Sequence, residues 1–317
     1  MRFVVAGAGA IGAYIGAKMA QAGLDVTLHA RGPHLRAMQA NGVRVVGAGG
    51  EFTVHPRVSG SLEEIGPCGT LILGVKAHGL PALAPDLHHV ISPETTVVTT
   101  QNGVPWWYFE GQRIECVDPG GVVSQAIERR RVVASIIYFS TEVAEPGVIR
   151  HTSGDRISLG EPDGTRSERC RRIGEAFVKS GLRAPITTHI REEIWVKLLG
   201  NMCFNPISAL TGATLVRMIK DPEVSQLIRH IMQEGECAAA RMGMKLPVSI
   251  DQRIAGAEKV GEHKTSMLQD WEAGRPLELE ALVGAVVELG EKLGVAMPHT
   301  RAVYACTKLM VECRPRP

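Results

Sequence analysis

Residues 3–12 read FVVAGAGAIG, and this stretch decides the fold of the amino-terminal half of the chain. The apolar, β-branched run predicts a strand over residues 2–6, and the alanine-rich residues 13–21 predict a helix. A second strand is expected over residues 25–30. The Gly-x-Gly-x-x-Gly of Gly7, Gly9 and Gly12 therefore lies in a strand–turn–helix–strand unit of about 30 residues, the context that a dinucleotide-binding loop requires.

Each glycine has its own expected role in that loop. Gly7 permits the tight turn that leaves the strand, Gly9 lets a pyrophosphate approach the backbone, and Gly12 lets the helix pack closely against the sheet. The helix then begins at Ala10 and Ile11, whose backbone N–H groups are expected to face the phosphates. A tight turn that binds no ligand is the alternative interpretation.

The end of the second expected strand indicates which dinucleotide is bound. An NAD site places an acidic residue there to bind the ribose 2′-hydroxyl. Asp25 lies at the beginning of this strand, whereas Arg31 follows its end, where a guanidinium can pair with a 2′-phosphate. The sequence therefore favours NADP(H) over NAD(H), with a solvated cation as the alternative interpretation of Arg31. Methyltransferases also use glycine loops, but they too usually have an acidic residue at this strand end.

The composition of the 317 residues is that of an ordinary soluble globular protein, and its length predicts two domains. The net charge of +2 argues against a nucleic-acid-binding surface, and the run Arg129–Arg131 is interpreted as a solvated turn. The apolar amino terminus could also be a signal peptide or a membrane span. Lys18, however, ends the run short of the ~20 residues that a spanning helix needs, so we expect neither.

The seven cysteines are scattered and include no Cys-x-x-Cys pair, and the 11 histidines show no metal-binding spacing. Neither a disulfide framework nor a metal site is expected, and free thiols suit a cytoplasmic protein.

Two further polar residues are expected at the same edge of the sheet as the glycine loop. Residues 70–75 and 95–101 read as buried strands, and Lys76 and Asn102 follow them directly. Ligands of open parallel sheets bind beyond the carboxyl ends of the strands, so both residues are candidates for ligand contact. The alternative for Asn102-Gly103 is a simple turn, because Asn-Gly is a strong turn dipeptide.

The character of the sequence changes near residue 188. Strands are expected over residues 132–139, 142–151 and 184–188, and a helix over residues 167–179. Beyond residue 190 helical periodicity dominates. The chain is therefore predicted to have a first domain of residues 1–188 and a helical domain of residues 189–317.

One helix of the second half, residues 193–206, carries polar residues at an unusual position. Lys197, Asn201 and Asn205 are spaced four apart, so they form one row along the edge of an apolar stripe, with Gly200 nearer the solvent side. Such a row suits the wall of a cleft, whereas three aligned surface residues are the alternative. Further along, Ser266 lies in another expected helix, and Glu278 lies in the first turn of the next, where an acid also suits the helix dipole.

In the order and spacing of these motifs, the chain resembles the ketopantoate reductase (2-dehydropantoate 2-reductase) family over nearly its full length. The matching features are the glycine loop, Arg31, Lys76, Asn102-Gly103, Lys197-x-x-x-Asn201-x-x-x-Asn205-Pro206, the segment Ser266-Met-Leu-Gln-Asp270, and Glu278.

The resemblance implies an α/β fold, with a Rossmann-type doubly wound sheet followed by an all-helical domain similar to the C-terminal domain of 6-phosphogluconate dehydrogenase, and an active site between the two. It implies NADPH-dependent reduction of a 2-keto acid to the 2-hydroxy acid, in the pathway to pantothenate and coenzyme A. The partner is then a small-molecule substrate, with no nucleic acid and no membrane; the sequence leaves open whether the chain forms a homodimer.

The resemblance also implies roles for the matched residues. Lys197 would be the general acid, with Glu278 as the second catalytic residue. Asn102, Asn201, Asn205 and Ser266 would contact the substrate. The cofactor would be bound by Gly7, Gly9, Ala10, Ile11, Gly12, Arg31, Lys76 and Asn102. Hydride attack on a ketone generates an alkoxide, so a positioned ammonium group that supplies a proton agrees with this chemistry.

Two departures from the family pattern concern the substrate. The family often has Thr-Glu-Ile-Asp followed by Asn-Gly, where this chain has Leu277-Glu278-Leu279-Glu280 followed by Val283-Gly284. Four aromatic residues, 106–109, follow Asn102-Gly103 closely and form either a core plug or lid, or a reshaped substrate pocket. The alternatives to the leading function are a β-hydroxyacid dehydrogenase with another substrate and a non-catalytic NADP(H)-binding sensor.

Overall fold

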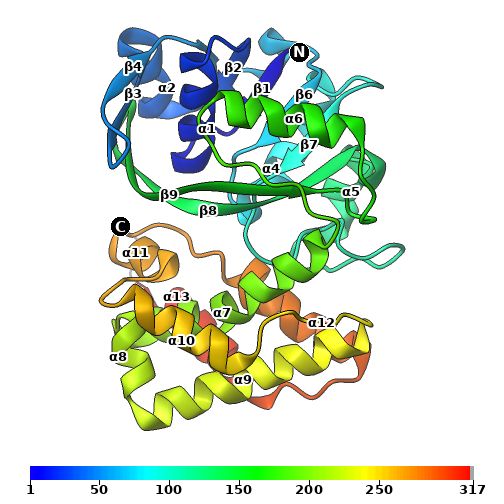
Figure 1. Cartoon of the computed structure of the whole chain (residues 1–317), viewed down its shortest axis with the longest axis vertical. Helices are drawn as coiled ribbons and strands as arrows, with labels where there is room; N and C mark the ends of the chain where they lie inside the picture. Colours follow the sequence, from blue (N-terminus) through cyan, green and yellow to red (C-terminus); the bar gives the residue numbers. More distant parts are fainter. Residues whose placement is uncertain (315–317) are drawn as a thin grey trace. The chain divides into compact units, whose positions relative to one another are not determined.

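The computed structural model describes residues 1–314, which form two compact units (Figure 1). Unit 1 comprises residues 1–101 and 120–190, and unit 2 comprises residues 102–119 and the chain from residue 191 onward. The chain therefore leaves unit 1 after residue 101 and returns to it at residue 120, before it enters unit 2 again. The sequence predicts one boundary, at residue 188.

Unit 1 contains a nine-stranded sheet in the order β4-β3-β9-β8-β7-β6-β1-β2-β5. Six adjacent strands, from β8 to β5, are parallel to one another, while β8 pairs with β9 and β3 with β4 in antiparallel fashion. The strands are β1 (Phe3–Ala6), β2 (Val26–His29), β3 (Val43–Gly47), β4 (Phe52–Val54), β5 (Arg57–Ser59), β6 (Thr70–Leu73), β7 (Thr96–Thr99), β8 (Val132–Glu145) and β9 (Val148–Gly160).

The long hairpin of β8 and β9, which Figure 1 shows in green, turns at residues 146–147. The expected strand 132–139 extends to residue 145 as β8, whereas the expected strand 142–151 spans the end of β8, the turn and the start of β9. The strand expected over residues 184–188 is reduced to isolated bridges of Arg183 and Ile186 to β9.

The central strands are buried on both faces, as their continuous apolar runs predict. Because side chains alternate along a strand, Phe3, Val5 and Ile72 point to the face covered by α1 and α6, whose side chains share one apolar core with them. The helices of unit 1 are α1 (Ala10–Gln21), α2 (Gly32–Asn41), α3 (Leu62–Ile65), α4 (Leu80–Leu83), α5 (Val122–Ala126) and α6 (Glu168–Lys179). This architecture confirms the predicted α/β fold.

The regular elements described in unit 2 are helices, as the periodicity beyond residue 190 predicts. They are α7 (Ile190–Thr211, whose first residue belongs to unit 1), α8 (Leu215–Lys220), α9 (Pro222–Arg241), α10 (Ile250–Val260), α11 (Ser266–Glu272), a π-helical turn (Glu280–Gly284), α12 (Ala285–Leu293) and α13 (Pro298–Glu312). No helix among residues 1–314 combines the length and the apolarity that crossing a membrane requires.

The aromatic residues 106–109 hold the segment 102–119 in unit 2. Trp106, Trp107 and Tyr108 are buried. The Tyr108 hydroxyl donates to the carbonyl of Arg191 at 2.8 Å, and its ring lies 6.2 Å from that of Trp195 on α7. These contacts support the core-plug interpretation of the aromatic cluster.

Candidate functional site

The glycine loop of unit 1 contains two glycines that the fold itself requires. Gly7 has a φ of +97°, which only glycine adopts readily, and a Cβ on it would lie 2.3 Å from Cγ1 of Val75. A Cβ on Gly12 would lie 2.2 Å from the carbonyl oxygen of Gly7. The first turn of α1 therefore packs directly on the turn that leaves β1.

Gly9 differs from both of its neighbours in the motif. It is exposed, its φ is −71°, and a Cβ on it would meet no atom of the described residues closer than 4.0 Å. Neither backbone conformation nor packing within unit 1 requires a glycine here. Gly9 is also the N-cap of α1, and among residues 1–314 no side chain caps this helix and no acid lies in its first turn, which begins with Ala10 and Ile11. Its free N–H groups and dipole make it suited to an anion.

Two residues that the sequence reasoning missed support this loop. A Cβ on Gly74 would lie 2.3 Å from the carbonyl oxygen of Gly7, so the chain beyond β6 packs tightly on the loop. The Gln101 amide donates to the carbonyls of Leu73 and Val75 at 2.9 and 2.8 Å and fixes that segment. The same segment leads to Lys76, which is partly exposed beyond the carboxyl end of β6.

The carboxyl end of β2 has one exposed and one buried potential cation. Arg31 is exposed and is the N-cap of α2 in extended conformation. His29 is buried, and burial lowers its pKa, as does the positive charge of Arg31 to a smaller extent. The imidazole of His29 is thus neutral near pH 7 and leaves Arg31 as the positive charge at this strand end.

In unit 2, two of the sequence-predicted residues contact each other directly. Lys197 Nζ, on α7, donates to Oδ1 of Asn102 at 2.8 Å. Residues 102 and 197 are far apart in the sequence, and they meet because the segment 102–119 is part of unit 2. The amide oxygen of Asn102 therefore fixes the position of the ammonium group.

A third predicted residue, Glu278, acts on Lys197 from the segment just before the π-helical turn. The sequence predicts it in the first turn of a helix, but the structure places it ahead of the helical residues. A Cβ on Gly103, whose φ is +91°, would lie 2.3 Å from the carbonyl oxygen of Ala281, and that carbonyl accepts from the N–H of Val104 at 3.0 Å. The Asn-Gly turn thus packs against the backbone that follows Glu278. The side chain of Glu278 is itself buried. π-helical turns are rare and are frequent at functional sites.

The surroundings of Lys197 make its ammonium group more acidic than an exposed lysine. Burial lowers the pKa of Lys197 from 10.5 to about 8; the carboxylate of Glu278 raises it and the guanidinium of Arg253 lowers it, both less than burial does. At pH 7 the group remains mostly protonated, but it gives up its proton more readily than a lysine in water. A proton donor with a pKa near the working pH is what general acid catalysis requires.

The remaining predicted residues of unit 2 differ in burial. Asn205 is buried on α7 at 5% exposure and Asn201 is half-buried, as expected for a row along the edge of an apolar stripe. Ser266 is exposed at the start of α11. The expectation that Gly200 lies near solvent is wrong: Gly200 is buried, because the side chain of Arg253 from α10 packs on it.

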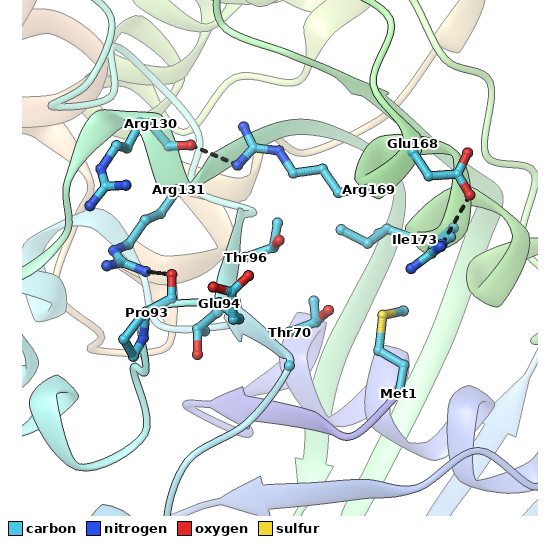
Figure 2. Close-up of a pocket in the computed structure, with 13 residues that line it drawn as sticks. Met1, Thr70, Pro93, Glu94, Thr96, Arg130, Arg131, Glu168, Arg169 and Ile173 are labelled. Atoms are coloured by element: carbon cyan, nitrogen blue, oxygen red, sulfur yellow. Dashed lines mark hydrogen bonds and ion pairs between the residues drawn. The ribbon is translucent and has the colours of Figure 1, made fainter.

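A cavity of about 570 Å³ opens elsewhere in unit 1, at the amino-terminal ends of the strands (Figure 2). Thr70 and Thr96, which begin β6 and β7, line it together with several arginines. Figure 2 shows two of these arginines bonded to backbone: Arg131 donates to the carbonyl of Pro93 at 2.8 Å, and Arg169 to that of Arg130 at 2.6 Å. The edge is opposite to that of the glycine loop, and these two guanidinium groups serve the structure.

Among residues 1–314, no group of three or more His, Cys, Asp or Glu side chains could hold a metal ion. The candidate chemistry of the described residues therefore consists of an anion-binding helix start in unit 1 and a lysine, an amide and a carboxylate in unit 2.

Comparisons with known proteins agree with this arrangement. The family model described as "Ketopantoate reductase PanE/ApbA" matches residues 3–164, and the model "Ketopantoate reductase PanE/ApbA C terminal" matches residues 189–311. The chain is 48% identical over 321 residues to the 2-dehydropantoate 2-reductase of Mesorhizobium japonicum, with 98% of each chain covered.

Solved structures show the same fold. A protein from Ralstonia solanacearum MolK2, proposed to be a ketopantoate reductase, aligns with a TM-score of 0.95 and 38% identity over 99% of this chain and 98% of its own. The 2-dehydropantoate 2-reductase from Methylococcus capsulatus aligns with a TM-score of 0.86 and 30% identity over 100% and 99% of the two chains.

Proposed function

This chain belongs to the ketopantoate reductase family, and from that premise we propose that it reduces 2-dehydropantoate, or a closely related 2-keto acid, to the 2-hydroxy acid with NADPH. The reaction would contribute to the synthesis of pantothenate and coenzyme A. The names of the relatives support the reaction, and the residues of the two units support the separate parts of the chemistry.

The observation that carries the proposal is the hydrogen bond of Lys197 to Asn102 beside Glu278. The bond fixes the position of the ammonium group, and the pKa of about 8 makes the group an effective acid. A half-buried lysine costs stability, and a cost of this kind is typical of a functional site. This constellation therefore favours an enzyme over a protein that only binds the dinucleotide.

Unit 1 has the features that a nicotinamide dinucleotide phosphate requires. The space at Gly9 and the uncapped start of α1 suit the pyrophosphate, and the exposed Arg31 suits a 2′-phosphate. The absence of an acid at this strand end among residues 26–31 favours NADP(H) over NAD(H). When bound, the cofactor supplies the hydride.

The side chains of unit 2 then donate a proton and stabilise the charge that develops on the substrate. Lys197 donates its proton to the keto oxygen of the substrate as negative charge develops there, and Asn102 keeps Nζ oriented during this step. Glu278 balances part of the positive charge and is available to accept from a substrate hydroxyl. Asn201 and Asn205 continue the row along α7 and would orient the substrate without adding charge.

The test is a spectrophotometric assay of NADPH oxidation with 2-dehydropantoate and a panel of other 2-keto acids, on the wild type and on Lys197→Met. We expect kcat of Lys197→Met to fall on the order of 10²-fold or more, with the dissociation constant of NADPH unchanged. Lys259→Met, which removes an exposed lysine of α10, is the matched control and should keep full activity.

The outcomes separate the alternatives. Full turnover by Lys197→Met would refute the general-acid role. Release of carbon dioxide with another hydroxy or keto acid would favour a β-hydroxyacid dehydrogenase, and NADPH binding without turnover across the panel would favour a sensor.

A further inference from the structure

The side-chain oxygen of Gln101 is a polar atom beside the glycine loop of unit 1 that the proposed roles do not use. Gln101 is half-buried and lies two residues after β7. Its Oε1 is buried, and among residues 1–314 no group donates a hydrogen bond to it. Buried amide oxygens are normally paired, because an acceptor without a donor has lost its hydrogen bonds to water without replacement. A ligand that donates to Oε1 would account for this atom.

The orientation of the Gln101 amide follows from its other contacts. Nε2 donates to the carbonyl of Leu73 at 2.9 Å and to that of Val75 at 2.8 Å. Carbonyl oxygens only accept, so the group that faces them must be the NH2, and an exchange of Oε1 and Nε2 would lose both bonds. Both N–H groups of the amide are therefore used, and the side chain can bind a further partner only by accepting through Oε1.

The segment that Nε2 binds is the one that packs on the glycine loop. A Cβ on Gly74 would lie 2.3 Å from the carbonyl oxygen of Gly7, and a Cβ on Gly7 would lie 2.3 Å from Cγ1 of Val75. Gln101 thus contacts the residues against which the phosphate-binding turn is packed. Its oxygen belongs to the immediate surroundings of that turn.

The strand order indicates which half of a dinucleotide approaches this side of the loop. β1 has β2 on one side and β6, followed by β7, on the other. Arg31, after β2, suits the 2′-phosphate of the adenosine half, and the start of α1 suits the pyrophosphate. Because the pyrophosphate joins the two halves, the nicotinamide riboside half is left for the side of β6 and β7. Gln101 follows β7 and is on that side.

We propose that Oε1 of Gln101 accepts a hydrogen bond from the nicotinamide riboside half of NADPH, while Nε2 holds residues 73–75 under the glycine loop. This half of the cofactor offers ribose O–H groups and a carboxamide NH2, and both are donors that match an uncharged acceptor. The inference rests on the proposed function, because it assumes the cofactor proposed there. It makes Gln101 a cofactor-binding residue that recognises the half of the dinucleotide that the glycine loop and Arg31 do not bind.

The experiment measures dissociation constants by calorimetry for three ligands of decreasing length. NADPH contains both halves, 2′-phospho-ADP-ribose lacks the nicotinamide, and adenosine 2′,5′-bisphosphate contains the adenosine half alone. The readout is the factor by which NADPH binds more tightly than the bisphosphate. We expect Gln101→Met to reduce this factor about 3- to 10-fold, the loss of one hydrogen bond. A disturbed glycine loop would weaken both ligands alike and leave the factor unchanged.

Two further variants separate the oxygen of Gln101 from its NH2. Gln101→Lys supplies N–H donors for the carbonyls of Leu73 and Val75 but no acceptor, so the factor should fall as in Gln101→Met. Thr100→Val is the matched control, because the Thr100 hydroxyl donates to the same Leu73 carbonyl at 2.7 Å. It removes a bond to that segment and leaves Oε1 in place, so the factor should stay at the wild-type value.

The outcomes distinguish this inference from its premise. If Gln101→Lys keeps the wild-type factor, or if neither Gln101 variant lowers it, Gln101 only fixes residues 73–75 and the inference is wrong while the proposed function stands. If 2′-phospho-ADP-ribose is weakened as much as NADPH, the donor is a ribose hydroxyl, and if only NADPH is weakened, the donor is the carboxamide. Binding is measured without turnover, so a wild type that binds NADPH but reduces no 2-keto acid would overturn the proposed function alone. A wild type that does not bind NADPH would overturn both.

Discussion

The glycine loop of unit 1 and the lysine cluster of unit 2 are built in opposite ways. The loop consists of backbone: a turn, bare glycines and the start of α1, all within residues 7–12. The cluster consists of side chains from α7, α10, the segment before the π-helical turn and the Asn102-Gly103 turn. Backbone sites depend on which residue lacks a side chain, whereas side-chain sites depend on long-range packing and on ionisation. The two should therefore respond differently to substitution, to charge and to pH.

The glycines of the loop give the largest expected difference. Gly7→Ala introduces both a disallowed φ and a clash with Val75, and it should lower the free energy of unfolding by about 2–4 kcal/mol. Gly9→Ala meets no such obstacle and should lower the thermal midpoint by only about 2–4 °C, since alanine is a poorer N-cap than glycine, yet raise the dissociation constant of NADPH by about tenfold or more. Thermal unfolding and fluorescence titration of NADPH measure the two effects. Equal loss of stability in both variants would contradict the proposal that the fold requires Gly7 whereas the cofactor requires Gly9.

Arg31 is a side chain that we propose to bind the cofactor next to the backbone of the loop. Arg31→Ala should reduce the preference for NADPH over NADH by about tenfold or more, because only the 2′-phosphate uses the guanidinium. The matched control is Arg36→Ala, which removes an exposed arginine of α2. The ratio of kcat/KM for the two cofactors is the readout, and an unchanged ratio in Arg31→Ala would remove the argument for NADP(H).

The pH dependence gives the smallest and most diagnostic effect. With a Lys197 pKa of about 8, kcat/KM should be level below pH 7 and fall about tenfold between pH 8.5 and 9.5, as the ammonium loses its proton. The backbone N–H groups of the loop do not titrate, so NADPH affinity should be constant over that range. The stability effect has the opposite sign: the unfolded lysine binds a proton up to its pKa of 10.5, so stability from this group rises with pH between about 8 and 10.5. A level rate up to pH 10 would contradict the assignment of Lys197.

The same contrast explains how much the sequence could predict. Gly7, Gly9 and Gly12 are contiguous, and their flanking strand and helix have clear periodicity, so fold and loop follow from local pattern. Lys197, Asn201 and Asn205 were identifiable because four-residue spacing places them in one row of a helix. Gln101, Gly74 and Arg253 were missed, since their importance lies in contacts with residues distant in the sequence, and no local signal marks them.

The excursion of residues 102–119 from unit 1 into unit 2 could not be predicted from local sequence pattern either. Its aromatic residues indicate that the segment is buried, but the sequence does not indicate in which of the two hydrophobic cores. The structure assigns Tyr108 to the core with Trp195, and the amide of Asn102 reaches Lys197 as a result.

That excursion has a consequence for how the polypeptide can be divided. A C-terminal fragment from residue 191 onward would lack Trp107 and Tyr108, which fill its interior, and Asn102, which orients its lysine. An amino-terminal fragment ending at residue 101 would lack β8 and β9, and with them the strands that join β7 to β3. During synthesis, the helical unit can complete its core only with a stretch made long before it, which the chain must keep available while the rest of the sheet emerges. Neither unit corresponds to a contiguous piece of the gene, and recombination by exchange of simple halves would disrupt both.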